Sequence, residues 1–523
     1  MRRVVVVVVS LIAILGIQVA PVMAQAPAPK VTITGLLDFV ANKYHNWPGL
    51  DVTDGGRDDG WYSRERGVFT LTGEVGRSKA VWAVELDFTN GAGANVTTTT
   101  FPGTTANMDL DGDVAGAVET KWLYVETPIT GPGSILPFIP VSGIIRAGQQ
   151  PARGHEYKVG ILLGGDIPGI AMETMWAPNM RSTLTFVQIG EKIDPITAAG
   201  QRESWALLAS LELEVFKGLT VKPTYAYASY DGGNPGTLNL GTEAKDGFSV
   251  NGTNLRTTRH TLGGDVRWTM GGFTLQPTFL VQLGEQEIPR IAAGPNAGTN
   301  EVDIRSWIFD TTAGYRIGPL NIEGRVMWTP GMGASHNVAN GADVNYYQAI
   351  NPAFAYMGGW TEIQTSGVDY ATALLAGAPG VSLRQSPSYD KYGRVFAALA
   401  ADYSVTPALT LKGLVNVSWT DEEVDTDRVL GATGLTGGDG RGDDRYLGTE
   451  VNLGLTYRFA PNVALDLIGA YLFAGDALNH RRTGGTAAAP GCRGDREGTS
   501  AGGAATCAAD DVYKLVSRVR ITF

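Results

Sequence analysis

The chain lacks most of the patterns on which enzymatic and metal sites depend. Its few histidines do not occur in an HExxH pattern, and no Ser and His pairing can be read from the sequence. These histidines are His45, His155, His260, His336 and His480. There is no CxxCH motif to attach a haem covalently, and no Cys and His spacing that suits zinc. The sequence therefore predicts no enzyme, no metal site and no cofactor.

Long apolar runs are also missing beyond the first residues. A helix needs about twenty apolar residues to cross a bilayer, and no uninterrupted run after residue 24 approaches that length. The start is the exception, with Arg2 and Arg3 before an apolar stretch and a small-x-small site at Val22–Ala24. This pattern predicts a signal peptide over residues 1–24. Since no linker divides the remainder, residues 25–523 are predicted to form one exported domain.

Basic residues are in the minority, and cysteine is nearly absent. The 41 Lys and Arg against 52 Asp and Glu give a formal net charge of −11, or −13 without Arg2 and Arg3. An acidic balance argues against a nucleic-acid partner. Cys492 and Cys507 share one Gly-rich segment, which predicts a disulfide worth about 3 kcal/mol in an exported protein. The alternative is a pair of free thiols.

What the sequence does have is alternation of apolar and polar residues, seen most plainly in Asp511–Phe523. One face of this stretch carries Tyr513, Leu515, Val519, Ile521 and Phe523. The other face carries Lys514, Arg518, Arg520 and Thr522. Because side chains alternate across a strand, one face is apolar and the other cationic. Strands of this kind recur from Val31 onward, which predicts an all-β fold.

The strands are joined alternately by short turns and long polar connections. Short turns are predicted near Gly76, Met180, Lys217, Gly271, Gly318, Thr406 and Pro461. The count is eighteen strands, with sixteen as the alternative because alternation is weak at 172–189 and 127–140. In a bilayer each unpaired backbone group costs several kcal/mol, so the last strand must pair with Val31–His45 and close a transmembrane antiparallel β-barrel. A secreted β-sandwich or solenoid could share the alternation.

Charges on the strands fall on the face opposite the apolar one, and they include Arg64, Arg66, Arg146, Arg518 and Arg520. A Lys or Arg facing lipid at mid-depth costs about 2–4 kcal/mol, so these side chains are predicted to line the lumen. Aromatic residues near strand ends are predicted to form two interfacial girdles. They include Trp61, Tyr62, Trp122, Tyr124, Trp268, Trp328, Tyr403, Trp419, Tyr457 and Phe459.

Two stretches resemble outer-membrane proteins of Gram-negative bacteria. A final strand that ends in Phe523 resembles the assembly signal of bacterial outer-membrane β-barrels. Ile145–Gln150 followed by residues 151–168 resembles the region of general and substrate-selective porins where a strand gives way to an inward-folded constriction loop. The match is partial, because Gln149 stands where porins often have a second basic residue.

Carried over from that resemblance, Arg146 and Gln149 would lie on the wall of the constriction. Candidates on the loop would be Arg153, His155, Glu156, Lys158 and Asp166. Opposed charges across a narrow pore would then orient dipolar solutes. The alternative is an ordinary surface loop with salt bridges. A second connection, residues 330–389, is long and aromatic, and is predicted to be extracellular, either as a lid or with a small core of its own.

The resemblance implies an outer-membrane porin through which small hydrophilic solutes or ions diffuse passively. It also implies that the barrel is surrounded by outer-membrane lipid and assembles as a homotrimer. Two other hypotheses stay open at this point. The barrel could be a sheath or scaffold for a partner such as a periplasmic cytochrome. It could also be an adhesin that acts through its long loops.

Overall fold

The computed structural model describes most of the chain after residue 27. The described residues are 28–46, 59–90, 107–108, 118–131, 134–158, 160–191, 203–231, 256–288, 290–291, 294–336, 341–350, 360–365, 367–368, 390–426, 429–431, 434–436, 440–482, 496–499, 505–507 and 509–523. The predicted signal peptide and Cys492 lie outside these residues. The signal peptide and the disulfide between Cys492 and Cys507 therefore stay predictions.

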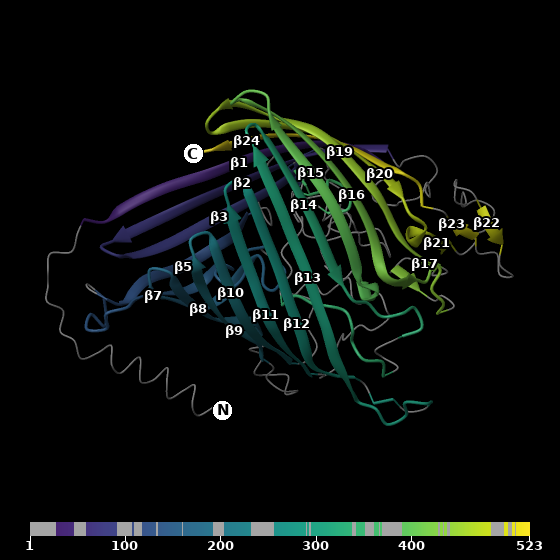
Figure 1. Cartoon of the computed structure of the whole chain (residues 1–523), viewed down its shortest axis with the longest axis horizontal. Coiled ribbons are helices and arrows are strands. Elements are labelled where there is room, and N and C mark those ends of the chain that lie inside the picture. The colour runs from purple at the N-terminus through teal and green to yellow at the C-terminus, as the bar shows by residue number, and fades with distance from the viewer. Residues whose placement is uncertain are drawn as a thin grey trace.

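The described residues form a large antiparallel sheet of long strands (Figure 1). Its first half comprises β1 Lys30–His45, β2 Asp59–Val75, β3 Ser78–Asn90, β5 Val118–Thr130, β6 Ser142–Pro151, β7 Asp166–Ala177, β8 Met180–Glu191, β9 Glu203–Phe216 and β10 Leu219–Asp231. Its second half comprises β11 Arg256–Met270, β12 Phe273–Glu287, β13 Glu301–Ile317, β14 Leu320–Thr329, β15 Arg394–Ser404, β16 Leu409–Val424, β19 Asp444–Ala460, β20 Val463–Ala474 and β24 Val512–Thr522.

Short elements lie outside this main series. The two-residue strand β4, Asn107–Met108, pairs with the end of β3. A separate small sheet joins β17 Val429–Gly431, β18 Gly434–Thr436, β21 His480–Arg482, β22 Arg496–Thr499 and β23 Ala505–Cys507. Two short 3-10 helices, η4 Asp390–Tyr392 and η5 Asp476–Leu478, complete the described elements. No helix in the described part of the chain is long and apolar enough to cross a membrane.

The main sheet closes on itself. It has 19 strands with β4, and the 18 long ones each pair with a neighbour on both sides. The closing pair is β1 with β24, antiparallel from Leu36 opposite Thr522 to His45 opposite Tyr513. The predicted closure and the count of eighteen strands are thus confirmed, and the alternative of sixteen is wrong. Closure removes the two exposed edges that an open sheet would present to lipid.

The C-terminal residue takes part in this closure. Gly35 N donates to Phe523 O at 2.7 Å, and Phe523 N donates to Gly35 O at 3.0 Å. The Phe523 ring covers Gly35 so closely that a Cβ at position 35 would lie 2.3 Å from the ring. A side chain at position 35 would therefore displace the Phe523 ring from the seam.

This seam gives a testable prediction for assembly. We expect Gly35→Val to lower the stability of the folded barrel by about 1–3 kcal/mol through overpacking against Phe523. The measurement is the fraction of protein that still migrates as the folded form on electrophoresis in the cold, after samples have been heated to increasing temperatures. Gly73→Val is the matched control, because a Cβ at Gly73 meets nothing within 4 Å. Equal melting of the two variants would contradict a role for Gly35 in closing the barrel.

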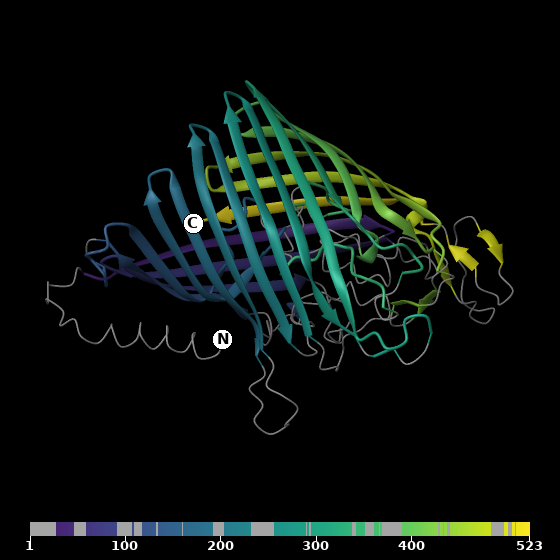
Figure 2. The ribbon, with the colours of Figure 1, turned by 60° about the horizontal axis from the view of Figure 1, so that its bottom comes forward.

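The two ends of the barrel differ as the sequence predicts. Turns at 76–77, 178–179, 217–218, 271–272, 318–319, 405–408 and 461–462 lie at one end. The long connections leave from the other end (Figure 2). Since both Lys30 and Phe523 lie at the short-turn end, an even number of strands connects them.

The outside of the barrel is apolar, as a lipid-facing surface requires. Exposed side chains on the closing strands include Ile33, Leu37, Leu515 and Val519. Aromatic contacts mark the short-turn end, where Trp268 meets Phe273 and Tyr457 meets Phe459. Others mark the long-loop end, where Trp307 meets Trp328 and Trp419 meets Tyr446.

The prediction of girdle positions is wrong for two aromatic residues. Tyr124 is only 8% exposed and lies under the Arg146 guanidinium, 5.6 Å from ring centroid to Cζ. Trp122 donates its indole N–H to Asp166 at 2.6 Å. Both therefore contribute to the polar interior, because Leu123 and Val125, 59% and 56% exposed, take the outward positions of β5 and their neighbours point inward. The side chain of Tyr62 lies outside the described part of the structure.

Candidate pore constriction

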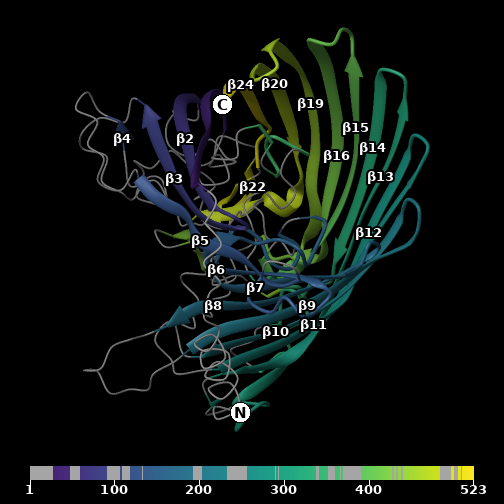
Figure 3. The same cartoon turned by 90° about the vertical axis from the view of Figure 1, so that its left-hand side faces the viewer.

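The connection between β6 and β7 folds into the barrel and lies along the inner wall (Figure 3). It spans Ala152–Gly165, because β6 extends through Pro151 and β7 begins at Asp166. Its contacts pass from strand to strand. His155 reaches β8 and β9, Tyr157 N donates to Asp265 of β11 at 3.0 Å, and Lys158 reaches β12 and β13. This segment, the constriction loop, thus crosses roughly a third of the wall.

The start of the loop is fixed by a buried histidine. His155 is 3% exposed, with Nε2 2.7 Å from Thr185 Oγ1 and Nδ1 3.0 Å from Ser210 Oγ. Thr224 Oγ1 donates to the His155 carbonyl at 2.9 Å. Burial, and then the nearby Lys222 ammonium, lowers the pKa of His155 from 6.5 to about 3. A neutral imidazole therefore suits this position.

Glu156 shapes the turn of the loop. Its carboxylate accepts backbone N–H groups from Gly160 at 2.9 Å, Leu162 at 2.7 Å and Leu163 at 3.2 Å. Burial, together with the charge of Asp265, raises the pKa of Glu156 from 4.5 to about 8 even though these N–H donors act in the opposite direction. His155 and Glu156 thus hold the loop rather than face open lumen, which differs from the pore-lining role expected of them.

These two residues predict how loop docking depends on pH. A lowered histidine pKa stabilises the docked loop above pH 6.5, and that contribution is lost as pH falls toward 3. A raised carboxyl pKa favours docking at low pH, and that contribution is lost as pH rises from 4.5 through about 8. We therefore expect open-channel current noise to be lowest between about pH 4.5 and 6.5.

The acid and the alkaline side of this expected pH dependence each have their own control. Glu156→Gln removes the ionisable group and should abolish the rise in noise at alkaline pH. His155→Gln should abolish the rise at acid pH while leaving the alkaline limb in place. A wild-type current noise that stays constant from pH 3 to pH 9 would contradict a docked loop held by these two groups.

Tyr157 is a site residue that the sequence analysis missed. Its ring lies between two cations, with Lys222 Nζ and Arg267 Cζ each 4.0 Å from the ring centroid. Such cation–π contacts stabilise most where water is excluded. The next residue, Lys158, donates to the carbonyls of Gln276 and Asp310, each at 2.7 Å. The tip of the constriction loop is therefore tied to the wall at several points.

A second inward segment comes from the long connection after β14. Residues 360–368, described except for residue 366, contact the wall from Arg325 of β14 to Lys514 of β24. Glu450 of β19 accepts the backbone N–H groups of Glu362, Ile363 and Gln364 at 2.8, 2.9 and 2.8 Å. Lys514 of β24 lies 3.7 Å from the Glu362 carboxylate. We call this segment the inner strap.

The same connection also packs on the constriction loop. Tyr347 O–H donates to Ile161 O at 3.0 Å, and Ile350 N donates to Leu162 O at 2.8 Å. Residues of both connections form an apolar core inside the barrel against inward wall residues such as Leu208 and Phe396. The connection over residues 330–389 is predicted to be extracellular. Its residues 347–350 and the inner strap instead lie within the lumen.

A sequence signal for this core exists in β9. Leu207 and Leu211 face outward, yet Ala206 and Leu208 on the opposite face are also apolar and fully buried. A barrel strand that is apolar on both faces has no water on its inner side. Such strands predict where an inward segment packs, and alternation alone does not.

The space left on the short-turn side of the constriction loop is a charged cavity of about 490 Å³. Six cations line this basic cavity, namely Lys79, Arg146, Arg153, Arg181, Lys222 and Arg267, against three carboxylates, Glu126, Glu173 and Glu212. The ion pairs are shared, since Glu126 contacts Lys79 at 2.7 Å, Arg146 at 2.8 Å and Arg153 at 3.4 Å. The basic cavity therefore carries an excess of positive charge.

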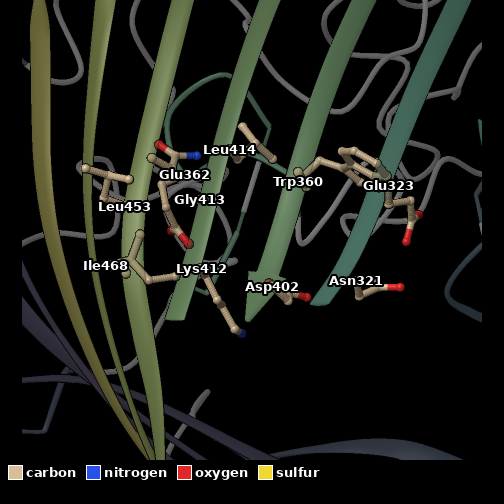
Figure 4. Close-up of a pocket in the computed structure, with 13 residues that line it drawn as sticks. Asn321, Glu323, Trp360, Glu362, Asp402, Lys412, Gly413, Leu414, Leu453 and Ile468 are labelled. Carbon is tan, nitrogen blue, oxygen red and sulfur yellow. The ribbon is translucent and has the colours of Figure 1, made fainter. Parts of the chain in front are cut away.

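An acidic cavity of about 220 Å³ lies under the inner strap. Figure 4 shows Trp360 and Glu362 of the strap beside wall residues Glu323, Asp402 and Lys412. Three carboxylates thus face one lysine. The basic cavity borders β3 to β11 and the acidic cavity borders β14 to β20, so fixed charges of opposite sign line different arcs of the wall.

The structure brings some of the predicted site residues together. Arg146 is 3% exposed and contacts Glu126 and Glu173 at 2.8 and 3.2 Å. Elsewhere in the lumen, Arg66 contacts Glu85 at 3.0 Å, and Arg64 is buried beside it on β2. Near the seam, Arg518 contacts Asp466 at 2.6 Å, and Arg520 contacts Asp38 at 2.8 Å.

Two predicted site residues are corrected by the structure. Gln149 pairs with Leu123, which is 59% exposed on the outer face, so Gln149 cannot line the lumen. Arg146 and Gln149 are three residues apart, and positions an odd number apart point to opposite faces of a strand. Gln150 is the inward residue, 3.4 Å from Arg146. Asp166 belongs to β7 rather than the loop, where it contacts Lys121 at 3.3 Å.

A closed barrel of 18 long strands, apolar outside and charged inside, has the fold of a porin-like outer-membrane β-barrel. Solved structures similar to this chain include OprD of Pseudomonas aeruginosa, with 10% identity, a TM-score of 0.46 and 96% of each chain covered. OccAB4 of Acinetobacter baumannii has 11% identity and a TM-score of 0.45, covering 95% of this chain and 99% of its own.

A third similar structure is OccK5 (OpdH) of Pseudomonas aeruginosa, with 10% identity and a TM-score of 0.43 over 94% of this chain and 98% of its own. Neither a protein-family model nor a curated protein sequence matches the chain.

Proposed function

We propose that the protein is an outer-membrane porin that forms a water-filled channel for passive diffusion of small hydrophilic solutes or ions. The observation that carries this proposal is the basic cavity of about 490 Å³ inside a closed barrel. A single water needs only about 10–15 Å³ of such space, so the cavity accommodates many waters. Fixed charges along a wet passage select solutes by electrostatics, and no catalytic step is needed.

Within this proposal the candidate residues have two kinds of role. Arg146 and Arg153, with Glu126, set the charge of the wall beside the constriction loop. Arg64, Arg66, Arg518 and Arg520 contribute charge on the arc near the seam. His155, Glu156 and Lys158 keep the loop in the lumen and thereby set the size of the passage.

The sheath hypothesis is less favoured by the same geometry. A barrel that holds a cytochrome needs a lumen free of its own chain. Here the constriction loop and the inner strap lie on the inner wall from β8 to β24. The adhesin hypothesis depends on long connections that lie largely outside the described residues, so it gains no support from the contacts above.

Liposome swelling tests the proposal directly. Purified barrels in liposomes should admit small neutral sugars, at rates that fall steeply as the sugar becomes larger, because the loops narrow the lumen. An uptake no faster than that of protein-free liposomes would contradict the proposal. Bacterial or host-cell binding that survives in the absence of uptake would instead favour the adhesin.

The domain limits and the oligomer are part of the same proposal. Cleavage after Ala24 would leave residues 25–523 as a single barrel domain in the outer membrane, surrounded by lipid. Association as a homotrimer follows from the resemblance to porins described above. N-terminal sequencing of the membrane-inserted protein and chemical cross-linking in native membranes measure these two properties separately.

A further inference from the structure

The two inward segments together form one collar on the inside of the barrel. The constriction loop contacts the wall from β8 to β13, and the inner strap contacts it from β14 to β24. Strands β13 and β14 are hydrogen-bonded neighbours joined by a two-residue turn. The boundary between the two segments therefore falls on one pair of adjacent strands.

A buried ion pair lies at that boundary. Arg325 of β14 donates Nε to Asp310 Oδ1 at 3.1 Å and Nη2 to Asp310 Oδ2 at 2.5 Å. Asp310 is fully buried and Arg325 is 5% exposed. Neither side chain lines the basic or the acidic cavity. The two-point geometry fixes the guanidinium plane, which a single contact would leave free to rotate.

Each inward segment rests on one half of this pair. Lys158 of the constriction loop lies 3.5 Å from Asp310 Oδ1 and donates to the Asp310 carbonyl. Trp360 of the inner strap lies over the other half, with the Arg325 Cζ 5.8 Å from its ring centroid. Asp310 therefore balances two cations, one from the wall and one from the loop.

We propose that the Asp310–Arg325 pair is a positioning clasp that couples the constriction loop to the inner strap. Removing the Asp310 charge leaves Lys158 and Arg325 facing each other without their shared counter-ion, which disfavours both contacts. The clasp sets the aperture without touching solute. The effect of the clasp on transport rests on the proposed function. The coupling itself is a property of the folded barrel and does not depend on that function.

Amide hydrogen exchange on the folded barrel in detergent micelles measures the coupling without any transport assay. We expect Asp310→Asn to speed exchange by about tenfold in both Ala152–Gly165 and Trp360–Val368, because both segments lose an anchor. Lys158→Met should speed exchange only in the constriction loop. Glu450→Gln should speed it only in the inner strap, whose three N–H groups it holds.

The outcomes separate the clasp from a local contact. Faster exchange in the constriction loop alone for Asp310→Asn, as in Lys158→Met, would overturn the proposal. Should Asp310→Asn fail to fold, Arg325→Lys keeps the charge but loses the two-point contact, and it must also speed exchange in both segments. An unchanged inner strap in Arg325→Lys overturns the proposal equally.

A bilayer recording then relates the clasp to the channel. Asp310→Asn should raise single-channel conductance and current noise while leaving the reversal potential in a salt gradient unchanged, since the pair lines neither cavity. A shifted reversal potential at unchanged conductance would mean that Asp310 acts as a pore charge, against the clasp. A silent wild type would fault the proposed function, and the exchange experiment would still decide on the clasp.

Discussion

A barrel in which Asn-Gly replaces residues Arg153–Gly164 conducts severalfold more current per channel than the wild type. The replacement removes the part of the chain that crosses the lumen and leaves both flanking strands intact. Ala152 N already donates to Gly165 O at 2.9 Å, and Pro151 pairs with Asp166, so the ends stand in hairpin register. Asn-Gly is the two-residue sequence that such a hairpin prefers. The measurement is single-channel conductance in planar bilayers.

The matched control shortens another long connection, the one between β12 and β13 at the same end of the barrel. Replacing residues 292–298 by Asn-Gly shortens the β12–β13 connection, whose ends are held by Ile291 N donating to Thr299 O at 2.9 Å. This variant should conduct like the wild type, because the tip is exposed and away from the two cavities. Equal conductance of wild type and loop-replaced protein would mean that the constriction loop does not limit current.

The second large effect is a change of ion selectivity through the basic cavity. We expect the double substitution Arg153→Glu and Arg267→Glu to shift the reversal potential toward cation preference. It turns six cations and three carboxylates into four cations and five carboxylates. Both side chains are exposed, so reversing their charge does not bury an unpaired ion. The shift should shrink as salt rises, because mobile ions screen the fixed charges.

Two controls fix the interpretation of that shift. Asp402→Lys in the acidic cavity should move the reversal potential the opposite way, toward anions. Lys217→Glu, in the exposed turn after β9, should move it little because Lys217 lines neither cavity. A shift of equal size for Lys217→Glu would place the selectivity at the membrane surface instead of in the cavity.

Much of the barrel could be predicted from local pattern. Alternation in Asp511–Phe523 predicts which side chains face lipid, and the structure leaves Leu515 and Phe523 exposed while burying Lys514. Closure between the last strand and Val31–His45 followed from the cost of unpaired backbone groups in lipid. Strand count followed from turns that local residues specify, such as Gly271 with a φ of +60°.

The interior could be predicted only in part, because it depends on contacts between residues far apart in sequence. Nothing local to Tyr157 indicates that Lys222 and Arg267 lie on its two faces. Nothing near Trp360 indicates that Glu450 accepts the amides of residues 362–364. Gln149 is different, since its outward position follows from its odd spacing from Arg146, and strand alternation takes precedence over a motif.

Single-channel recording of the wild-type protein in planar bilayers tests the central claim most directly. The account predicts stable openings with ohmic current, noise that is lowest in mildly acid solution, and a conductance well below that of the loop-replaced barrel. A wild type that is silent while the loop-replaced barrel conducts would mean that the constriction loop and inner strap seal the lumen, which contradicts an open channel for passive diffusion.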